Sequence, residues 1–414
     1  MSNDRARPRL LDLTRLSRRA GRRPTGVDRV EQAYLRRLVA LESPAFALVR
    51  SSHGFILLDR DGMAALLARI DGRVAWGPPD VLSRIVRGLD PARRRSEADL
   101  RRLAQARCLP TGLARMLRRH FPGGVNYINL GHSNLGVRVL RAVRTLPGAR
   151  IAVMIHDTIP LDHPEFQRPE TPAAFAAMLR RVQAHADVVL CNSATTEAAL
   201  RRHMRRHGPM PRTLVAHLGI DLPAQMTGQA ELPHAIDPVR PWFCTVGTIE
   251  PRKNHALLLD ASDDLARELP AAEMPQLLIC GARGWMNDAV FARLDAARDN
   301  PHIHELPGLD DAALAALVNG AAGMLFPSRA EGYGMPPIEA AALGAPVVCA
   351  PLPVYRETLG DIPIYLSLQD RYSWVRKIIG LTADHRAGHS AGMHTRAFRP
   401  PTWDMHFKTV FTVL

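Results

Sequence analysis

The segment 323–350, "GMLFPSRAEGYGMPPIEAAALGAPVVCA", places a loop and a helix-forming stretch between two short apolar runs. The runs "GMLFPS" and "PVVCA" are predicted to be buried strands, and "PPIEAAAL" is predicted to be a helix. Pro336 and Pro337 fit the first turn of that helix, where N–H groups have no intrahelical partner, and Gly344 suits its end. Strand, helix and strand in this order indicate a unit of a parallel sheet.

The same alternation of apolar runs and amphipathic stretches extends from about Leu10 to the end of the chain. Continuous apolar strands between helices indicate parallel sheets covered on both faces. The fold class is therefore α/β, with two Rossmann-like, doubly wound domains facing a cleft, where ligands bind beyond the carboxyl ends of the strands. The predicted strands are "LLDLTRL", "AFALVRS", "GFILLD", "NYINLG", "IAVMIHD", "DVVLCNS" and "RTLVAHLG", then "WFCTVGTI", "QLLICGA", "IHELPG", "GMLFPS", "PVVCA" and "IPIYLS".

A Pro-rich, polar segment around 221–241 separates the two series of strands and is expected to be a linker. We expect an N-terminal domain over 1–225, the linker proper over 226–240, and a second domain over 241–395. The segment 396–414 is predicted to be a helix that packs back toward the N-terminal domain, with Thr402 as its N-cap.

Composition limits the class of protein. No apolar run reaches the roughly 18–20 residues that span a bilayer, and the first residues lack the pattern of a secretory signal. The five cysteines form no C-x-x-C pair or Cys/His cluster, and four of them lie in predicted strands. We expect reduced, buried thiols, neither a zinc site nor disulfides, and a cytoplasmic location, possible also at the inner face of the cell membrane.

The excess of positive charge lies in the first half of the chain. Residues 1–225 contain 38 Lys and Arg against 19 Asp and Glu, whereas the whole chain has a net charge of +14. Such asymmetry indicates contact with a polyanionic surface. In the basic segment 93–121, Leu113, Met116 and Leu117 can share one helical face. That helix either lies on an anionic membrane or packs on the core with a solvated basic side.

The loop of the first segment has the chemistry of an anion site. Gly332 and Gly334 allow the close approach of backbone amides to a ligand, and the helix N-terminus behind them favours negative charge. Glu331 precedes that helix and Glu339 projects from its first turn. Amides for phosphate and acids for hydroxyls suit a phosphorylated sugar. A capped helix with two solvated acids is the simpler alternative.

Other polar residues follow predicted strands elsewhere. In "EPRKNH", Arg252 and Lys253 are placed to neutralise a diphosphate, although an exposed basic turn would look the same. In the same segment, Asn254 is predicted to cap the following helix. His156 ends the strand "IAVMIHD" and is either structural or part of a site. Asn192–Ser193 is most simply a helix cap.

Together these segments resemble glycosyltransferase family 4, a family of retaining enzymes with the GT-B fold. The resemblance extends from Thr25 to about Trp403. It is strongest in "IHDTIPLDHPEF", "NSATTEAAL", "HLGID", "VGTIEPRKNHALLLDA", "LFPSRAEGYGMPPIEAAALGAPVV" and "PVYRETLGD". Residues 52–120 match nothing in the family, so the acceptor that the N-terminal domain would bind is left open.

The resemblance assigns roles to residues. It implies that Glu331 lies by the transferred sugar, that Arg252 and Lys253 grip the diphosphate, and that His156 lies beside the sugar. It implies that Glu339 holds the ribose and that Gly308 meets the base. The predicted catalytic residues are Glu331, His156, Arg252 and Lys253, and the predicted donor-binding residues are Glu339, Gly332, Tyr333, Gly334, Met335, Gly26, Thr25, Gly308 and Gly247.

The implied activity is the retaining transfer of a hexose, with mannose as first choice, from a nucleotide-diphosphate sugar such as GDP-mannose. The expected acceptor is a saccharide, lipid-linked, in surface polysaccharide synthesis, with no cofactor, no metal and no nucleic acid. A nucleotide-sugar epimerase, a sugar phosphorylase or a non-catalytic carbohydrate-binding protein would share the two-domain shell. Asp59-x-Asp61 resembles the metal-binding pair of another glycosyltransferase fold, but it is also an ordinary turn signal.

Overall fold

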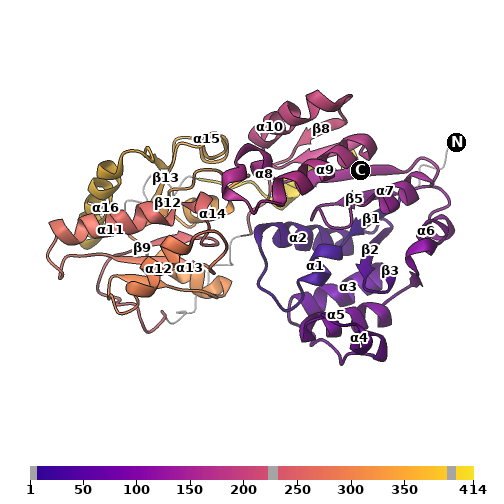
Figure 1. The fold of residues 1–414 in the computed structure, drawn as a ribbon, viewed down its shortest axis with the longest axis horizontal. Helices are drawn as coiled ribbons and strands as arrows, with labels where there is room; N and C mark the ends of the chain where they lie inside the picture. The colour runs from indigo at the N-terminus through magenta and orange to yellow at the C-terminus, as the bar shows by residue number, and fades with distance from the viewer. Residues whose placement is uncertain (1–6, 222–231, 389–397) are drawn as a thin grey trace.

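The computed structural model of this chain describes residues 7–221, 232–388 and 398–414. Within them the strands form two sheets, one of eight and one of six strands. Figure 1 shows two units side by side, the N-terminal one in indigo to magenta and the C-terminal one in orange. The predicted α/β class with two Rossmann-like units is confirmed.

Two predicted boundaries fall in the gaps. Residues 226–231 of the predicted linker 226–240 lie outside the described residues. Residues 232–240 contain no helix or strand. The predicted boundary at 395–396 lies outside them as well.

The N-terminal sheet has the order β4-β3-β2-β1-β5-β6-β7-β8. It is parallel except that β3 runs antiparallel to β2 and β4. The unpredicted strand β4 lies in the region that matches no family motif, and the predicted strand "LLDLTRL" ends early because a helix begins at Thr14. The strands are β1 Arg9–Asp12, β2 Ala45–Ser51, β3 Gly54–Leu58, β4 Ala106–Cys108, β5 Asn126–Asn129, β6 Arg150–Ile155, β7 Val188–Cys191 and β8 Arg212–Val215.

Helices connect these strands and cover both faces of the sheet (Figure 1). The longest of these helices are α2 and α9, both of 15 residues. The helices are α1 Thr14–Arg18, α2 Gly26–Ala40, α3 Arg60–Ile70, α4 Val81–Ile85, α5 Pro91–Arg102, α6 Leu113–His120, α7 Val137–Arg144, α8 Ile159–Asp162, α9 Thr171–His185 and α10 Ala194–Met204.

The C-terminal sheet is parallel throughout and has the order β11-β10-β9-β12-β13-β14. All six of its strands coincide with predicted runs. In β9, β10, β12 and β13 the run is largely apolar and buried between helices, whereas β11 and β14 are only half-buried. The elements are β9 Trp242–Val246, α11 His255–Glu268, β10 Gln276–Cys280, α12 Asp288–Ala296, β11 Ile303–Glu305, α13 Asp311–Asn319, β12 Gly323–Phe326, α14 Met335–Ala342, β13 Val347–Cys349, α15 Pro353–Leu359, β14 Ile364–Tyr365 and α16 Arg371–Arg386.

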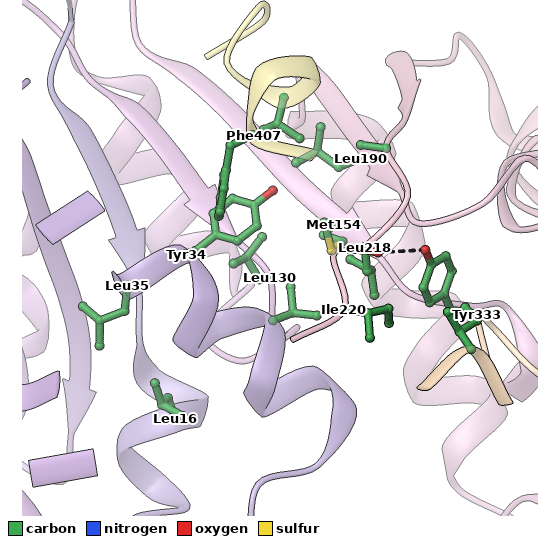
Figure 2. Packing of buried hydrophobic residues seen from close by; sticks show 14 of the residues in the cluster. Leu16, Tyr34, Leu35, Leu130, Met154, Leu190, Leu218, Ile220, Tyr333 and Phe407 are labelled. Carbon is green, nitrogen blue, oxygen red and sulfur yellow. Dashed lines mark hydrogen bonds between the residues drawn. The ribbon is translucent and has the colours of Figure 1, made fainter. Parts of the chain in front are cut away.

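The chain crosses back to the N-terminal unit at its end. The last helix, α17 Trp403–Val410, is capped by the Thr402 hydroxyl, as predicted. It packs on α2, where the Tyr34 hydroxyl lies 2.8 Å from Nε2 of His406 and the Tyr34 and Phe407 rings are 4.9 Å apart. Figure 2 shows this contact in a core cluster that also includes residues of the C-terminal unit. The cluster joins the two units through packing.

The basic segment 93–121 is not one helix. It contains α5, the short strand β4 and α6, and the three apolar residues of α6 are at most 7% exposed in the core. The prediction that Leu113, Met116 and Leu117 could face a lipid surface is therefore wrong, because the same pattern covers a protein core here. No helix among the described residues has the length and apolar character to cross a bilayer.

The cysteines follow the prediction in part. All five are free thiols, and the four in β7, β9, β10 and β13 are buried. Cys108 is half-buried on β4, where a helical stretch was expected.

Candidate active site

The loop after β12 leads into helix α14, as the sequence predicts. Gly334 has a left-handed backbone with φ of +87° directly before α14, and the helix ends before Gly344, which has φ of +87° as well. Asn254 departs from its predicted role: it precedes α11 in a left-handed conformation, but its side chain accepts a hydrogen bond from Arg329 and does not cap the helix.

Both glycines of the loop are required by close packing. A Cβ on Gly332 would lie 2.4 Å from the carbonyl oxygen of His156 in the N-terminal unit. A Cβ on Gly334 would lie 2.4 Å from the ring of Tyr355. Gly332 therefore allows the two units to come close at this point of the loop.

Glu331 is the centre of a buried ionic cluster. Its carboxylate accepts hydrogen bonds from Arg252 Nη1 at 2.7 Å and Lys253 Nζ at 2.5 Å, and from the Ser328 hydroxyl at 2.8 Å. Burial acts to raise the pKa of Glu331, but the two cations outweigh it and hold the pKa at about 2. The carboxylate is therefore ionised at neutral pH, and both of its oxygens accept hydrogen bonds.

The two cations come from the turn after β9, Pro251–Lys253. Arg252 also pairs with Glu250 at 2.7 Å, and its acidic neighbours raise its pKa although burial opposes them. Burial lowers the pKa of Lys253, and Glu331 acts against that decrease. Lys253 passes close to Gly247, where a Cβ would lie 3.1 Å from its Cε. Gly247 thus makes room for the lysine side chain.

Glu339 lies in a different environment, on the side of α14 that faces α2. Its carboxylate is 3.3 Å from Arg29 Nη1, and Arg29 Nη2 also pairs with Asp311 at 2.6 Å. Burial raises the pKa of Glu339, and Arg29 only partly compensates. Arg29 was not predicted as a site residue, because nothing in the sequence places α2 against α14.

A cavity of about 220 Å³ adjoins this ion pair. Arg29, Asp311 and Glu339 supply charge, and Met335 lies in its wall. Its apolar lining comes from β9, β12, α13 and α14, and includes Val246, Leu314, Val318, Met324 and Leu343. An apolar floor with a few charged groups is the usual form of a small-molecule site.

On the N-terminal unit, His156 follows β6 and is buried. Its Nε2 lies 2.7 Å from the carbonyl oxygen of Leu130, an acceptor, so Nε2 carries the proton and Nδ1 is left as an acceptor. Burial and the neighbouring His132 lower the pKa of His156 to about 3. The imidazole is therefore neutral at physiological pH and can accept a hydrogen bond from a hydroxyl.

Asp157 is a site residue that the sequence interpretation did not assign. Burial raises its pKa, while Arg252 lowers it and Glu331 raises it across the junction of the two units. A Cβ on Gly332 would lie 2.8 Å from its Cβ. Its position after His156 at the end of β6 was the available signal.

The remaining predicted residues lie in three places. Thr25 caps α2 in a capping box with Asp28, and a Cβ on Gly26 would lie 3.6 Å from Met335 Sδ. A Cβ on Gly308 would lie 3.7 Å from Arg23 Nη2. The Tyr333 side chain faces away: its hydroxyl donates to the Leu218 carbonyl oxygen in the core, as Figure 2 shows.

The structure therefore brings Glu331, Arg252 and Lys253 together and sets Gly332 against His156. Glu339 and Met335 lie at the separate cavity, near Gly26. Asp59 caps α3 by accepting from the Gly62 amide, so a helix cap accounts for it.

The chain is similar to known proteins in sequence and in structure. Residues 232–363 match the family described as "Glycosyl transferases group 1". The chain is 32% identical over 235 residues to the serotype-specific mannosyltransferase WbdA of Escherichia coli. The matched segment covers 53% of this chain and 28% of that protein. The chain is 39% identical over 136 residues to the O-antigen chain mannosyltransferase RfbU of Salmonella typhimurium (strain LT2), covering 32% of this chain and 36% of that protein. The chain thus spans well under half the length of these relatives.

Solved structures share the whole fold. Anabaena Alr3699/HepE, crystallised with UDP and glucose, superimposes with a TM-score of 0.62 at 13% identity, over 98% of this chain and 99% of that one. Sucrose-phosphate synthase from Thermosynechococcus elongatus has a TM-score of 0.59 at 15% identity, over 94% and 93% of the two chains. At such identities the likeness concerns the fold alone.

Proposed function

We propose that this chain is a retaining, metal-independent hexosyltransferase. The proposal starts from the predicted resemblance to glycosyltransferase family 4 and its GT-B fold, which is confirmed. Its donor is a nucleotide-diphosphate sugar, with GDP-mannose as first choice. Its acceptor is a saccharide, lipid-linked, in surface polysaccharide synthesis. The names of the relatives, a serotype-specific and an O-antigen chain mannosyltransferase, support the choice of mannose and of the pathway.

The observation that carries the proposal is the buried cluster of Glu331, Arg252 and Lys253 at the start of α14. In the ligand-free protein these two cations are paired with Glu331 and Glu250, and the N-terminus of α14 adds its own partial positive charge beside them. A diphosphate supplies the charge that neutralises such a site. The neutral His156 and the half-buried Asp157 lie across the junction from Gly332, where the sugar and the attacking hydroxyl would meet.

The transfer needs one bond to break and one to form at the anomeric carbon. The bond from this carbon to the diphosphate oxygen breaks, and the bonding electrons leave with the diphosphate, whose charge Arg252 and Lys253 stabilise. The acceptor hydroxyl oxygen bonds to the same carbon, and its proton goes to the departing diphosphate on the same face. Configuration is retained because the leaving group and the nucleophile use one face of the sugar.

The structure supports this route over a covalent intermediate on Glu331. Two cations hold the carboxylate of Glu331 and keep its pKa at about 2, which lowers its basicity and with it its strength as a nucleophile. Its charge is better suited to holding those cations in place and to stabilising positive charge on the sugar.

At the other end of the donor, the proposal places the ribose at Glu339 and the base near Gly308. Arg29 now pairs with Glu339 and would have to release it when a ribose hydroxyl binds. The cavity between α2, α13 and α14 provides an apolar surface next to this carboxylate.

A panel of nucleotides and nucleotide-sugars tested by thermal shift identifies the donor, since a ligand that binds the folded state raises its stability. Incubation with the stabilising nucleotide-sugar and analysis of the products then separates transfer or hydrolysis from epimerisation and from phosphorolysis. Stabilisation by none of the panel, or an epimerised sugar as the product, would contradict the proposal.

Contact with an anionic membrane is proposed for the N-terminal unit on the basis of its 38 Lys and Arg against 19 Asp and Glu over 1–225. A suitable surface is α4, where Val81 and Ile85 are 73% and 65% exposed and Arg84 and Arg87 are exposed beside them. Flotation with vesicles tests this. Salt-sensitive binding to acidic vesicles that is weakened by Ile85→Ser and Arg84→Gln is expected, and equal indifference to acidic and neutral vesicles would contradict it.

A further inference from the structure

The start of α10, residues Asn192–Thr196, makes more contacts than a helix cap requires. The Ser193 hydroxyl accepts a hydrogen bond from the Thr196 amide at 3.0 Å, which is the predicted cap. The same hydroxyl lies 3.3 Å from the carbonyl oxygen of Gly332, in the C-terminal unit. A cap serves its own helix, whereas this contact joins two units of the protein.

The Thr196 hydroxyl lies between two backbone carbonyl groups. It is 3.2 Å from the oxygen of Gly332 and 3.3 Å from the oxygen of His156, and its one proton is shared between them. The Asn192 amide group donates to the same His156 oxygen at 2.9 Å. One helix start thus holds the backbone beside Glu331 and the backbone of His156.

Glu357 of α15 also binds the start of α10. Its carboxylate accepts from the amides of Ala194 and Thr195 at 2.6 and 3.0 Å and from the Thr195 hydroxyl at 2.9 Å, and it lies 2.9 Å from His217 Nε2. Burial acts to raise the pKa of Glu357, but these partners hold it at about 2. A carboxylate from one unit therefore occupies the helix N-terminus of the other.

We infer that residues Asn192–Thr196, together with Glu357, are an interdomain bracket that positions His156 and Asp157 against Glu331 for the reaction. This inference rests on the proposed function for its effect on turnover, but not for its effect on structure. The bracket residues touch the backbone of the site and no reacting atom, so they are positioning residues. Small displacements at a reacting centre reduce the rate strongly, by as much as about 100-fold for 1 Å.

Thr196→Val is the clearest test, because it removes the hydroxyl from a 4% exposed side chain and keeps its shape. We expect the turnover number to fall about 10- to 100-fold with the KM for the donor little changed. Thr196→Ser, which keeps the hydroxyl, should restore most of the rate. Thr382→Val is the matched control, since Thr382 is 3% exposed and its hydroxyl bonds only the Ile378 carbonyl within α16.

Hydrogen exchange of the ligand-free protein gives a second measurement that needs no substrate. Thr196→Val and Glu357→Gln should both speed the exchange of amides in 331–334 and 194–196, and Thr382→Val should not. If the wild-type protein turns over none of the nucleotide-sugars, the proposed function is refuted. The inference about the bracket is then tested by hydrogen exchange alone. Unchanged exchange at 331–334 in Thr196→Val, or a turnover equal to that of Thr382→Val, would overturn the inference.

Discussion

Replacing Glu331 by Gln tests the proposed site most directly, because it changes one charge and little volume. In the ligand-free protein this carboxylate pairs with Arg252 and Lys253, whose side chains are 22% and 12% exposed. Lowering its pKa from the ordinary 4.5 to about 2 corresponds to about 3 kcal/mol in favour of the charged form. Glu331→Gln should therefore lower the free energy of unfolding at pH 7 by about that amount, leaving two cations with a weaker partner.

The pH dependence of this loss has a defined sign. A carboxyl group whose pKa is depressed in the folded state stabilises the protein above its unfolded pKa and loses that contribution as pH falls through the folded value. The stability difference between wild type and Glu331→Gln should be constant from pH 7 to about 5 and should shrink between pH 4.5 and 2. Denaturant unfolding at a series of pH values measures it.

Ligand binding and turnover should respond in opposite directions. Without the Glu331 charge, Lys253 loses its ion-pair partner and Arg252 keeps only Glu250, so GDP should bind Glu331→Gln at least as tightly as it binds wild type. Turnover of the donor should fall about 10²- to 10³-fold, since one charged contact at a reacting centre is worth about 2.7–4 kcal/mol. Calorimetry with GDP and sugar release from GDP-mannose provide the two measurements.

Glu97→Gln is the control for these experiments. Glu97 is 4% exposed on α5, pairs with Arg93 and Arg101, and also accepts a backbone hydrogen bond far from the cleft. Its replacement should reduce stability and leave turnover unchanged. A Glu331→Gln enzyme that keeps wild-type turnover, or that loses GDP binding, would refute the reasoning.

Arg252→Ala and Lys253→Ala should each weaken GDP binding and slow transfer together, and survival of both quantities would mean that the diphosphate is held elsewhere. Gly332→Ala should separate the two units, because the added Cβ would lie 2.4 Å from a backbone oxygen. We expect a severe loss of turnover and a larger radius in small-angle scattering, whereas Gly136→Ala, which has open space around it, should change neither. Activity should persist in a chelator, since two fixed cations can replace a divalent metal. Inactivation by EDTA with recovery in manganese would instead favour a metal-dependent reaction.

Much of the fold was predictable because its strands are short apolar runs between amphipathic helices. Four strands of the C-terminal sheet, β9, β10, β12 and β13, need no tertiary information to be found, since burial on both faces requires largely apolar sequence. Strand β4 has three residues, and none of them is fully buried. Its sequence, "ARC", therefore carries no such signal, and it is held by pairing with β3.

The environment of each side chain was less predictable than the element that carries it. The apolar face of α6 has the same pattern whether it covers a core or a membrane, and only the structure shows that Leu117 is buried. Likewise, "NSATT" reads as a helix cap because capping is a local property. Its contacts with Gly332 span 136 and 139 residues of the sequence. They depend on how the two units meet.

The two acids of the opening motif illustrate the same limit. Eight residues apart in sequence, they look equivalent, yet their pKa values shift in opposite directions. Glu331 has two cations from its own unit, so its charge is retained in spite of burial. Glu339 has one partly exposed cation, Arg29, from the other unit, with Asp311 and Asp221 nearby, so burial prevails.

This difference fits the roles proposed for the two acids. The charge of Glu331 is fixed by partners 78 and 79 residues away in the same unit, and a donor would bind against an electrostatic arrangement that is already built. The pairing of Glu339 depends on the approach of α2, so a ribose that takes the place of Arg29 at Glu339 also changes a contact between the units. Binding at the nucleoside end would thus be coupled to the position of the N-terminal unit through an ion pair, whereas the side-chain partners of Glu331 at the diphosphate end all belong to its own unit.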